Sequence, residues 1–235
     1  GNLALLGDKS FLISERGDAF LMYAVRWRSF VALHEPIGNP QSGRELLLRF
    51  MAVADRAGGW PVLYQIGPDY LPLCIELGFA IVKLGEEAFV SLRDFTLDGG
   101  RRKGLRRSHR EAARGGATFE VVERGAVHTI LPELERVSDS WLQQKATAEK
   151  GFSLGVFDRD YLCNFDIAVV RVGERIVAFA NILTAGNSDV SVDLMRHDNT
   201  GPDGVMDFLF VELMLWAQGR GFRRMGLGMA PLSGF

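Results

Sequence analysis

Residues 205–218 read VMDFLFVELMLWAQ and form the most apolar stretch of the chain. Only scattered polar side chains such as Asp207 and Glu212 interrupt it. Glycines follow at Gly219 and Gly221, so the pattern predicts a helix over 205–218 that ends there. Because this helix is apolar on nearly every side, we expect it to be sandwiched between two layers of the protein.

The segments around this helix are predicted strands, rich in β-branched and aromatic residues. They cover residues 167–172, 175–183, 189–195 and 224–229, with a Gly- and Pro-containing loop at 197–204. The first half of the chain shows the same order. It has predicted strands at 19–25 and 29–33, a loop at 34–40, a helix that Ser42 and Glu45 would cap and that ends near Ala57, and a strand at 61–66.

The unit of strand, strand, loop, helix and strand therefore occurs twice. We predict an α/β (α+β) protein with two similar lobes, each a mostly antiparallel sheet with helices on its faces. The chain has 235 residues, of which 47% are hydrophobic and 24% charged, and this composition excludes a disordered chain.

The charge is uneven along the chain. The net charge is −2 overall, which excludes a globally basic nucleic-acid binder. It is −3 over residues 1–98, +5 over 99–124 and −4 over 125–235. We therefore predict an N-terminal lobe at 1–98, and a basic linker helix followed by a C-terminal lobe at 99–235.

The basic segment carries four candidate substrate-binding arginines. On a helix, Arg102, Arg106 and Arg110 fall on one face, and Arg107 lies beside them. Like charges at this spacing repel each other, so an anionic partner would relieve them. RNA phosphates, lipid headgroups or an acidic protein surface would all serve, and a solvated linker helix is the plain alternative.

The string SVDLMR at residues 191–196 supplies the candidate catalytic residues. Strict alternation in a strand places Ser191, Asp193 and Met195 on one face, and Val192, Leu194 and Arg196 on the other. Asp193 would then point among apolar neighbours, where a carboxylate needs a partner or a function. A structural ion pair and a catalytic role are equally compatible with this pattern.

A further candidate ligand segment follows Trp141. The spacing of Trp141, Lys145 and Glu149 is helical, and the residues after Lys150 read GFSLG. Lys145 and Lys150 are candidate substrate-binding residues, because a Gly-containing backbone can approach a ligand closely. A helix end with a glycine cap would explain the same pattern.

The sequence predicts no metal site and no bound cofactor. The four histidines lack metal-binding spacing, and the two cysteines, Cys74 and Cys163, are most simply core residues. There is no phosphate-binding glycine motif and no nucleophile elbow. No apolar run is long enough to span a bilayer.

At several of these residues the chain resembles a known family. The strings are FLMY at 20–23, EPIG at 35–38, EKGFSLG at 149–155, SVDLMR at 191–196, GVMDFLFVELM at 204–214 and LGMAPLSG at 227–234. Together they resemble the C-terminal catalytic domain of bacterial aminoacyl-phosphatidylglycerol synthases, the lysyl- or alanyl-phosphatidylglycerol synthases that are also called multiple peptide resistance factors.

The resemblance implies two acetyltransferase-like (GNAT) lobes in tandem and an aminoacyltransferase activity. Such an enzyme moves lysine or alanine from aminoacyl-tRNA to the glycerol headgroup of phosphatidylglycerol, which lowers the negative charge of the membrane and gives resistance to cationic peptides. Asp193 and Arg196 carry over as active-site residues. The arginines at 102, 106, 107 and 110 would meet anionic lipid headgroups or the tRNA acceptor stem.

The resemblance also implies segments outside this sequence. The family usually has an N-terminal multi-pass membrane region that flips the product lipid, and a further segment after the string MAPLSG. We therefore expect the C-terminal lobe to be truncated at Phe235, and the catalytic face to lie at the cytoplasmic face of the inner membrane.

Three other functions stay open at the level of sequence. One is a tRNA-dependent transferase with a non-lipid acceptor. Another is an acetyl-CoA-dependent N-acetyltransferase, but the loop after Arg196 has the wrong glycine spacing and contains Pro202 and additional carboxylates. The third is a non-enzymatic lipid- or RNA-binding module that uses only the basic segment.

Overall fold

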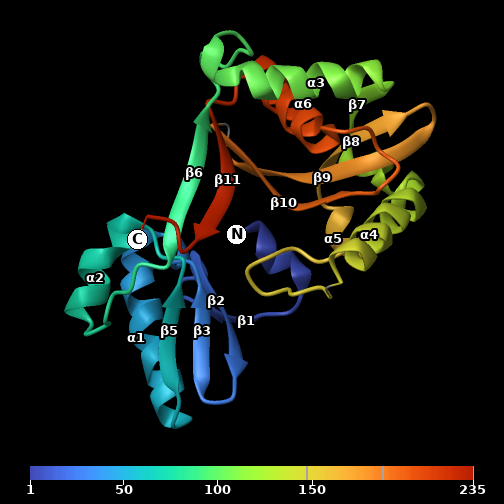
Figure 1. Ribbon diagram of the computed structural model, residues 1–235. Coiled ribbons are helices and arrows are strands. Elements are labelled where there is room, and N and C mark those ends of the chain that lie inside the picture. Colours follow the sequence, from blue (N-terminus) through green and yellow to red (C-terminus); the bar gives the residue numbers. More distant parts are fainter. Residues whose placement is uncertain (147, 187, 235) are drawn as a thin grey trace. The chain divides into compact units, whose positions relative to one another are not determined.

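The computed structural model describes residues 1–146, 148–186 and 188–234 (Figure 1). The chain divides into two compact units. The first comprises Gly1–Lys83 with Gly151–Gly155, and the second Leu84–Lys150 with Val156–Phe235. The division therefore lies before the position at residue 98 that the charge pattern predicts, and residues 84–98 belong to the second unit.

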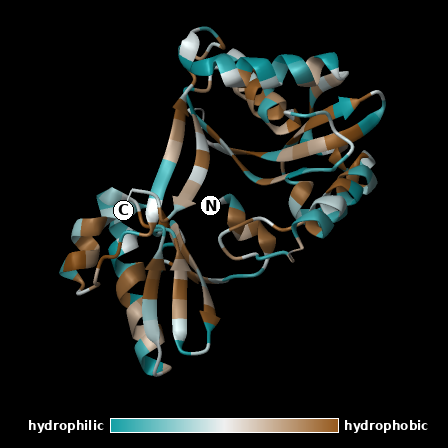
Figure 2. Cartoon of the chain, viewed as in Figure 1, coloured by the Kyte–Doolittle hydropathy of each residue, from teal (hydrophilic) through white to brown (hydrophobic). Residues whose placement is uncertain are grey.

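The first unit is a sheet of mostly antiparallel strands with one long helix. Its strands are β1 (Ser10–Ile13), β2 (Ala19–Arg26), β3 (Ser29–Leu33), β4 (Ile37–Gly38) and β5 (Trp60–Tyr64), and its helices are η1 (Asn2–Leu6), α1 (Pro40–Arg56), η2 (Pro68–Tyr70) and α2 (Leu71–Glu76). The strand order is β1-β2-β3-β5, with β4 paired to β2. The helix α1 follows β4 and leads to β5, which lies parallel to β3. Its buried residues Leu47, Phe50 and Ala54 pack on the sheet, and Figure 2 shows apolar and polar residues mixed along the helix.

The start of α1 differs from the prediction. Asn39 caps the helix by accepting the backbone N–H of Gln41, and Pro40 occupies the first turn, where its missing N–H costs nothing. Ser42, predicted as the cap, lies inside the helix and donates to Asp18 at 2.8 Å. The capping-box pattern was wrong because an earlier Asn-Pro pair provides the stronger start signal.

The second unit is a sheet of six strands covered by helices on both faces. Its strands are β6 (Gly85–Ser91), β7 (Ala117–Val122), β8 (Asp166–Val172), β9 (Arg175–Ala185), β10 (Asp189–His197) and β11 (Arg224–Pro231), in the order β6-β11-β10-β9-β8-β7. Its helices are η3 (Gly100–Arg102), α3 (Lys103–Arg114), η4 (Arg124–Thr129), α4 (Leu131–Lys145), α5 (Arg159–Leu162) and α6 (Val205–Gly219). The helices α3 and α6 cover one face, and α4 and α5 lie on the other (Figure 1).

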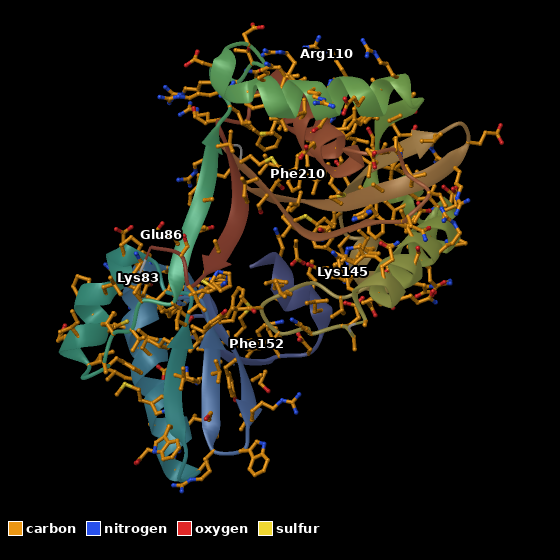
Figure 3. All side chains as sticks on the ribbon, in the orientation of Figure 1. Lys83, Glu86, Arg110, Lys145, Phe152 and Phe210 are labelled. Carbon is orange, nitrogen blue, oxygen red and sulfur yellow. The ribbon has the colours of Figure 1, made fainter. Side chains whose placement is uncertain are left out.

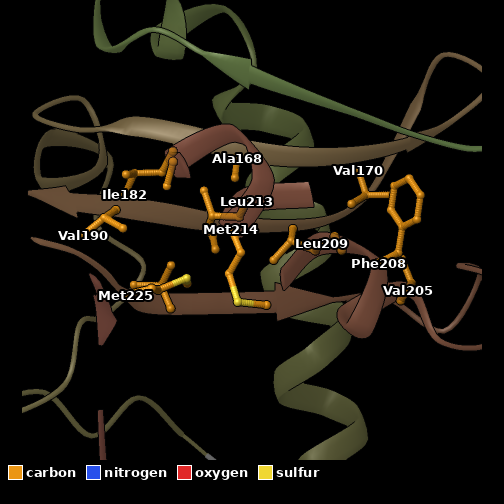
Figure 4. Packing of buried hydrophobic residues seen from close by; sticks show 14 of the residues in the cluster. Ala168, Val170, Ile182, Val190, Val205, Phe208, Leu209, Leu213, Met214 and Met225 are labelled. Carbon is orange, nitrogen blue, oxygen red and sulfur yellow. The ribbon is translucent and has the colours of Figure 1, made fainter. Parts of the chain in front are cut away.

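The most apolar helix lies where its composition predicts. Buried residues of α6, among them Leu209, Leu213 and Met214, pack on Ala168, Ile182 and other side chains of the sheet (Figure 4). The helix α3 also packs against α6, where His109 stacks on the ring of Phe208 and contacts Glu212. The helix α6 is therefore covered by the sheet and by α3, which agrees with the predicted burial of its apolar sides, while Leu215 stays partly exposed.

The repeated topology is also confirmed. In the first unit the antiparallel pair β2–β3 is followed by α1 and the parallel strand β5. In the second unit the antiparallel pair β9–β10 is followed by α6 and the parallel strand β11. The strands β10 and β11 pair only from Asp189 to Ser191, after which β11 continues its pairing with β6.

Candidate active site

The strand β10 contains a bulge at the candidate catalytic residues. Val192 pairs with Ile182 and Met195 pairs with Ala180, so that two residues of β10, Asp193 and Leu194, face the single residue Asn181 of β9. An extra residue of this kind kinks a strand and redirects its side chains.

The side chain of Asn181 satisfies the backbone of the bulge. Its Oδ1 accepts the N–H of Asp193 at 3.1 Å and the N–H of Leu194 at 2.8 Å. Asn181 is fully buried, and these bonds replace the ladder bonds that the bulge removes. An asparagine in the middle of an apolar strand therefore determines the local geometry of the candidate site.

The bulge changes which side chains share a face, so the prediction from strict alternation was wrong. Val192 packs in the cluster under α6, whereas Arg196 contacts Trp141 of α4 on the opposite face. Asp193 receives a hydrogen bond from Tyr161 of α5, which also lies on the α4 side (Figure 1). Asp193 and Arg196 are thus on the same face, although their spacing of three would separate them in a regular strand.

Arg196 is held by an anion and an aromatic ring. Its Nη2 lies 2.8 Å from Oε2 of Glu149, and its guanidinium carbon lies 3.9 Å from the centre of the Trp141 ring. Only 9% of the side chain is exposed. Burial lowers the pKa of Arg196 from its ordinary value, while the charges of Glu149 and Asp193 oppose that shift.

One donor of this guanidinium remains unused among the described residues. The Nε atom of Arg196 is buried and has no acceptor within that part of the chain. Buried donors without a partner are uncommon in folded proteins, and functional sites are among the places that keep them.

Asp193 is positioned through a buried tyrosine. The hydroxyl of Tyr161 donates to Oδ2 of Asp193 at 2.9 Å. The tyrosine is fixed in turn, because Asp158 caps α5 by accepting its backbone N–H at 2.7 Å and Phe165 packs edge-on against its ring. The second unit therefore places a carboxylate and a guanidinium near each other, each held by its own supporting groups.

Glu149 and Tyr161 were missing from the predicted site. The helical spacing from Trp141 through Lys145 to Glu149 was misleading, because α4 ends at Lys145 and Ala146 takes a left-handed conformation, with φ +46°. Glu149 lies beyond the helix and also accepts the N–H of Phe157 at 3.2 Å. A buried arginine needs an anionic partner, and this requirement is the signal that would have pointed to Glu149.

The two predicted lysines are on the surface. Lys145 is the last residue of α4 and is exposed (Figure 3). Lys150 is exposed as well. They lie near Glu149 in the sequence, but the structure assigns them no role in holding Arg196 or Asp193. Their binding role stays a prediction.

The basic arginines are on α3 or just before it, on the face opposite Asp193 and Arg196. Arg102 donates to the carbonyl of Thr96, and Arg106 donates to the carbonyls of Leu97 and Gly99. These two arginines therefore hold the preceding loop.

The other two arginines of the basic segment are more accessible. Arg107 forms an ion pair with Glu111 at 2.7 Å, and its side chain is 77% exposed. Arg110 is exposed and donates to the carbonyl of Arg106 (Figure 3). The structure thus separates the four arginines into two structural and two surface groups, and does not bring them to the candidate catalytic residues.

The described residues contain neither a metal-binding cluster nor a membrane-spanning helix. Over residues 1–146, 148–186 and 188–234, no cluster of His, Cys, Asp or Glu side chains is suited to a metal ion. Within the same ranges no helix is long and apolar enough to cross a membrane.

Comparison with known proteins identifies the relatives of this chain. The family described as "Phosphatidylglycerol lysyltransferase, C-terminal" matches residues 1–235. A phosphatidylglycerol lysyltransferase of Bacillus subtilis is 40% identical over 234 residues, which are 99% of this chain and 27% of that protein. One of Staphylococcus epidermidis is 35% identical over 99% of this chain and 28% of that protein.

A solved structure agrees with these matches. The structure of L-PGS from Bacillus licheniformis is similar with a TM-score of 0.93 and 40% identity, over 99% of this chain and 74% of that one. The chain therefore spans little more than a quarter of the length of the curated relatives, but most of the solved relative.

Proposed function

The chain belongs to the family of phosphatidylglycerol lysyltransferase C-terminal domains, and we propose that it transfers lysine from lysyl-tRNA to a headgroup hydroxyl of phosphatidylglycerol. The observation that carries the proposal is the bulge in β10, because it sets Asp193 and Arg196 on one face. Membership of the family supports the substrate, and the geometry supports the assignment of the residues.

The proposed reaction is an exchange of esters. The lipid hydroxyl oxygen attacks the carbonyl carbon of the lysyl ester and forms a tetrahedral oxyanion. The oxyanion then collapses, the bond to the terminal ribose oxygen of the tRNA breaks, and the hydroxyl proton ends on that ribose oxygen. The ester is already activated, so alignment, charge stabilisation and proton transfer are sufficient catalysis.

Arg196 is the group suited to stabilise negative charge on the substrate. It would stabilise the oxyanion or the lipid phosphate, and its ring contact with Trp141 fixes the guanidinium plane. Glu149 balances this charge when no substrate is present. A fixed cation in a poorly solvated site stabilises developing charge more strongly than one in water.

Asp193 is the group suited to accept a proton or to bind an ammonium group. It would accept the proton of the lipid hydroxyl or orient the amino group of the aminoacyl moiety. The hydrogen bond from Tyr161 restricts the rotation of the carboxylate, which favours either role.

The remaining partners follow from the proposed substrates. Arg107 and Arg110 on α3, together with Lys145 and Lys150, are surface cations that would contact tRNA phosphates or anionic headgroups. An N-terminal membrane region would flip the product, and lysyl-tRNA would be supplied at the cytoplasmic face of the inner membrane.

The loop between β10 and α6 disfavours acetyl-CoA as the donor. Asp198 in that loop is buried and bound by Arg136 at 2.6 Å, and it accepts the N–H of Thr200 at 2.9 Å. A loop that holds a pyrophosphate offers its N–H groups to the phosphate, whereas here a carboxylate occupies one of them and Pro202 has none.

The test is a transfer assay with the protein at its natural length. Phosphatidylglycerol vesicles are mixed with labelled lysyl-tRNA, and the lipids are separated by thin-layer chromatography. We expect label in the lipid, and a loss of about 100-fold or more in Asp193→Asn. A matched control is Asp189→Asn on the same strand, whose carboxylate pairs with Arg224, and which should retain activity.

Three outcomes would contradict the proposal. If the folded protein produces no labelled lipid, the proposed reaction is refuted. Label from alanyl-tRNA alone would correct the amino acid. Activity of Asp193→Asn above about 10% of the unmodified protein would remove Asp193 from the chemistry.

A further inference from the structure

A tryptophan stands fully in solvent at one end of the first unit. Trp27 is 99% exposed, the highest value among the large hydrophobic side chains of the described residues. It lies in the turn between β2 and β3, where Arg26 pairs with Ser29. No packing of the core explains an indole at this position.

The backbone of this turn also disfavours a tryptophan. Trp27 has φ +57°, in the left-handed region where Gly, Asn and Asp are favoured. In two-residue hairpin turns the first position with positive φ is commonly glycine. The chain therefore carries a large aromatic side chain where folding alone would favour a small residue.

The surroundings of Trp27 are aromatic and basic. Trp60, at the start of β5, is 61% exposed, and the guanidinium carbon of Arg28 lies 5.0 Å from its ring centre. The backbone N–H of Trp60 donates to the carbonyl of Arg28 at 2.7 Å, and Nε of Arg28 donates to the carbonyl of Gly58 at 2.8 Å. The β2–β3 turn and the start of β5 are thus tied together.

This end of the unit carries more positive than negative charge. Arg26, Arg28 and Arg56 are exposed here, with Asp55 as the neighbouring acid at the end of α1. Figure 1 shows the end of α1 and the β2–β3 turn at the same end of the first unit. We call residues 25–28, 55–56 and 60 the hairpin tip.

We propose that the hairpin tip is a membrane-binding surface that inserts Trp27 into the headgroup region of an anionic bilayer. Tryptophan is enriched at the membrane–water interface, because its ring is apolar and its N–H is polar. Arginines beside it attract anionic lipids, each strengthening binding by about fivefold. The combination of an exposed indole with flanking arginines is complementary to a lipid surface in both respects.

The tip is distinct from the site of Asp193 and Arg196, which lies in the second unit. The inference shares with the proposed function the expectation of a lipid partner. It does not depend on the transfer reaction, because vesicle binding is measured without any aminoacyl-tRNA.

The experiment is flotation of the chain of residues 1–235 with vesicles of equal parts phosphatidylglycerol and phosphatidylcholine, and with vesicles of phosphatidylcholine alone. Binding should require the anionic lipid and weaken as salt is raised. Trp27→Gly should lower the partition coefficient by about tenfold or more, and Arg26→Gln by about fivefold. A matched control is Ile75→Asn, which removes an apolar side chain that is 63% exposed on α2 of the same unit.

Trp27→Gly is expected to fold, because glycine accepts positive φ without strain. Its urea midpoint should equal or exceed that of the unmodified protein, and Trp27→Asn serves as a second variant with the same backbone tolerance. Binding of both variants within twofold of the unmodified protein would overturn the proposal. So would a loss of affinity for tRNA with vesicle binding intact, which would assign the tip to nucleic acid.

A second readout separates this inference from the proposed reaction. Transfer to phosphatidylglycerol in vesicles should fall in Trp27→Gly, while transfer to a short-chain phosphatidylglycerol dispersed as monomers should be unchanged. If Trp27→Gly loses vesicle binding and the unmodified protein shows no transfer activity, the reaction is refuted and the membrane-binding role of the hairpin tip is supported.

Discussion

Removal of Glu149 tests whether the buried charge of Arg196 depends on its counterion. In Glu149→Ala the guanidinium of Arg196 loses the carboxylate at 2.8 Å, and the N–H of Phe157 loses its acceptor. Breaking a fully buried ion pair costs about 3–5 kcal/mol. The Glu149 side chain is 27% exposed, and Asp193 still compensates part of the charge, so we expect a loss of about 2 kcal/mol in the free energy of unfolding.

The matched control is an exposed ion pair in the same unit. Arg159 and Glu135 lie 2.6 Å apart, with side chains 56% and 42% exposed. Exposed pairs of this kind contribute about 0–1 kcal/mol, so Glu135→Ala should leave stability nearly unchanged. The two ion pairs are similar in length and differ in burial, and Glu149 additionally accepts the N–H of Phe157.

The assay is urea unfolding at pH 7, followed by fluorescence and by circular dichroism. With an m value of about 2 kcal/mol per molar, Glu149→Ala should lower the midpoint of the second unit by roughly 1 M. Because the chain has two compact units, which need not unfold in a single transition, both probes are fitted for two transitions. Equal midpoints for Glu149→Ala and Glu135→Ala would refute the reasoning that Arg196 needs Glu149 as its counterion.

Two further predictions concern the support of the same strand. Asn181→Ala leaves the N–H groups of Asp193 and Leu194 without their acceptor. Because each unsatisfied group costs about 1–3 kcal/mol, the variant should lower the free energy of unfolding of the second unit by at least about 2 kcal/mol. Hydrogen exchange at these two amides should become faster, and unchanged exchange would contradict the role of Asn181 in the bulge. Burial raises the pKa of Asp198, but hydrogen bonds from Arg136 and Thr200 outweigh burial and hold that pKa below the ordinary value of an aspartate. Asp198 therefore stabilises the fold at pH values above its pKa in the unfolded chain, and this contribution is lost as the pH falls through its lower pKa in the folded protein. Asp198→Asn should be less stable than the unmodified protein at pH 7. Its free energy of unfolding, measured at each pH, should fall less steeply between about pH 5 and 2.

The sequence alone was sufficient to predict the helices and strands whose apolar residues recur with a strong period. The predicted strand at 29–33 and the helix at 205–218 agree with β3 and α6 to within a residue, because both have clear apolar patterns and breakers at their ends. The strand β6 was not predicted. Its residues, GEEAFVS, are mostly exposed and carry two acids, and the strand exists because β11 pairs with it.

The candidate site was only partly predictable for a different reason. Asp193 and Arg196 were selected by residue type and by family resemblance, but their partners come from distant parts of the chain. Glu149 lies 47 residues before Arg196, and Tyr161 lies 32 residues before Asp193. A single sequence contains no signal for such pairs beyond the requirement that a buried charge be balanced.

The bulge explains how a spacing of three can make one site on a strand. In a regular strand Asp193 and Arg196 would point to opposite sides of the sheet, and one of them would face the apolar core under α6. The inserted residue moves Arg196 to the side of Asp193 and brings Met195 to the core side together with Val192. The motif DLMR thus depends on a residue outside it, since Asn181 is what stabilises the bulge. A substitution of Asn181 should therefore affect the position of both charged groups together, whereas loss of Tyr161 should affect Asp193 alone.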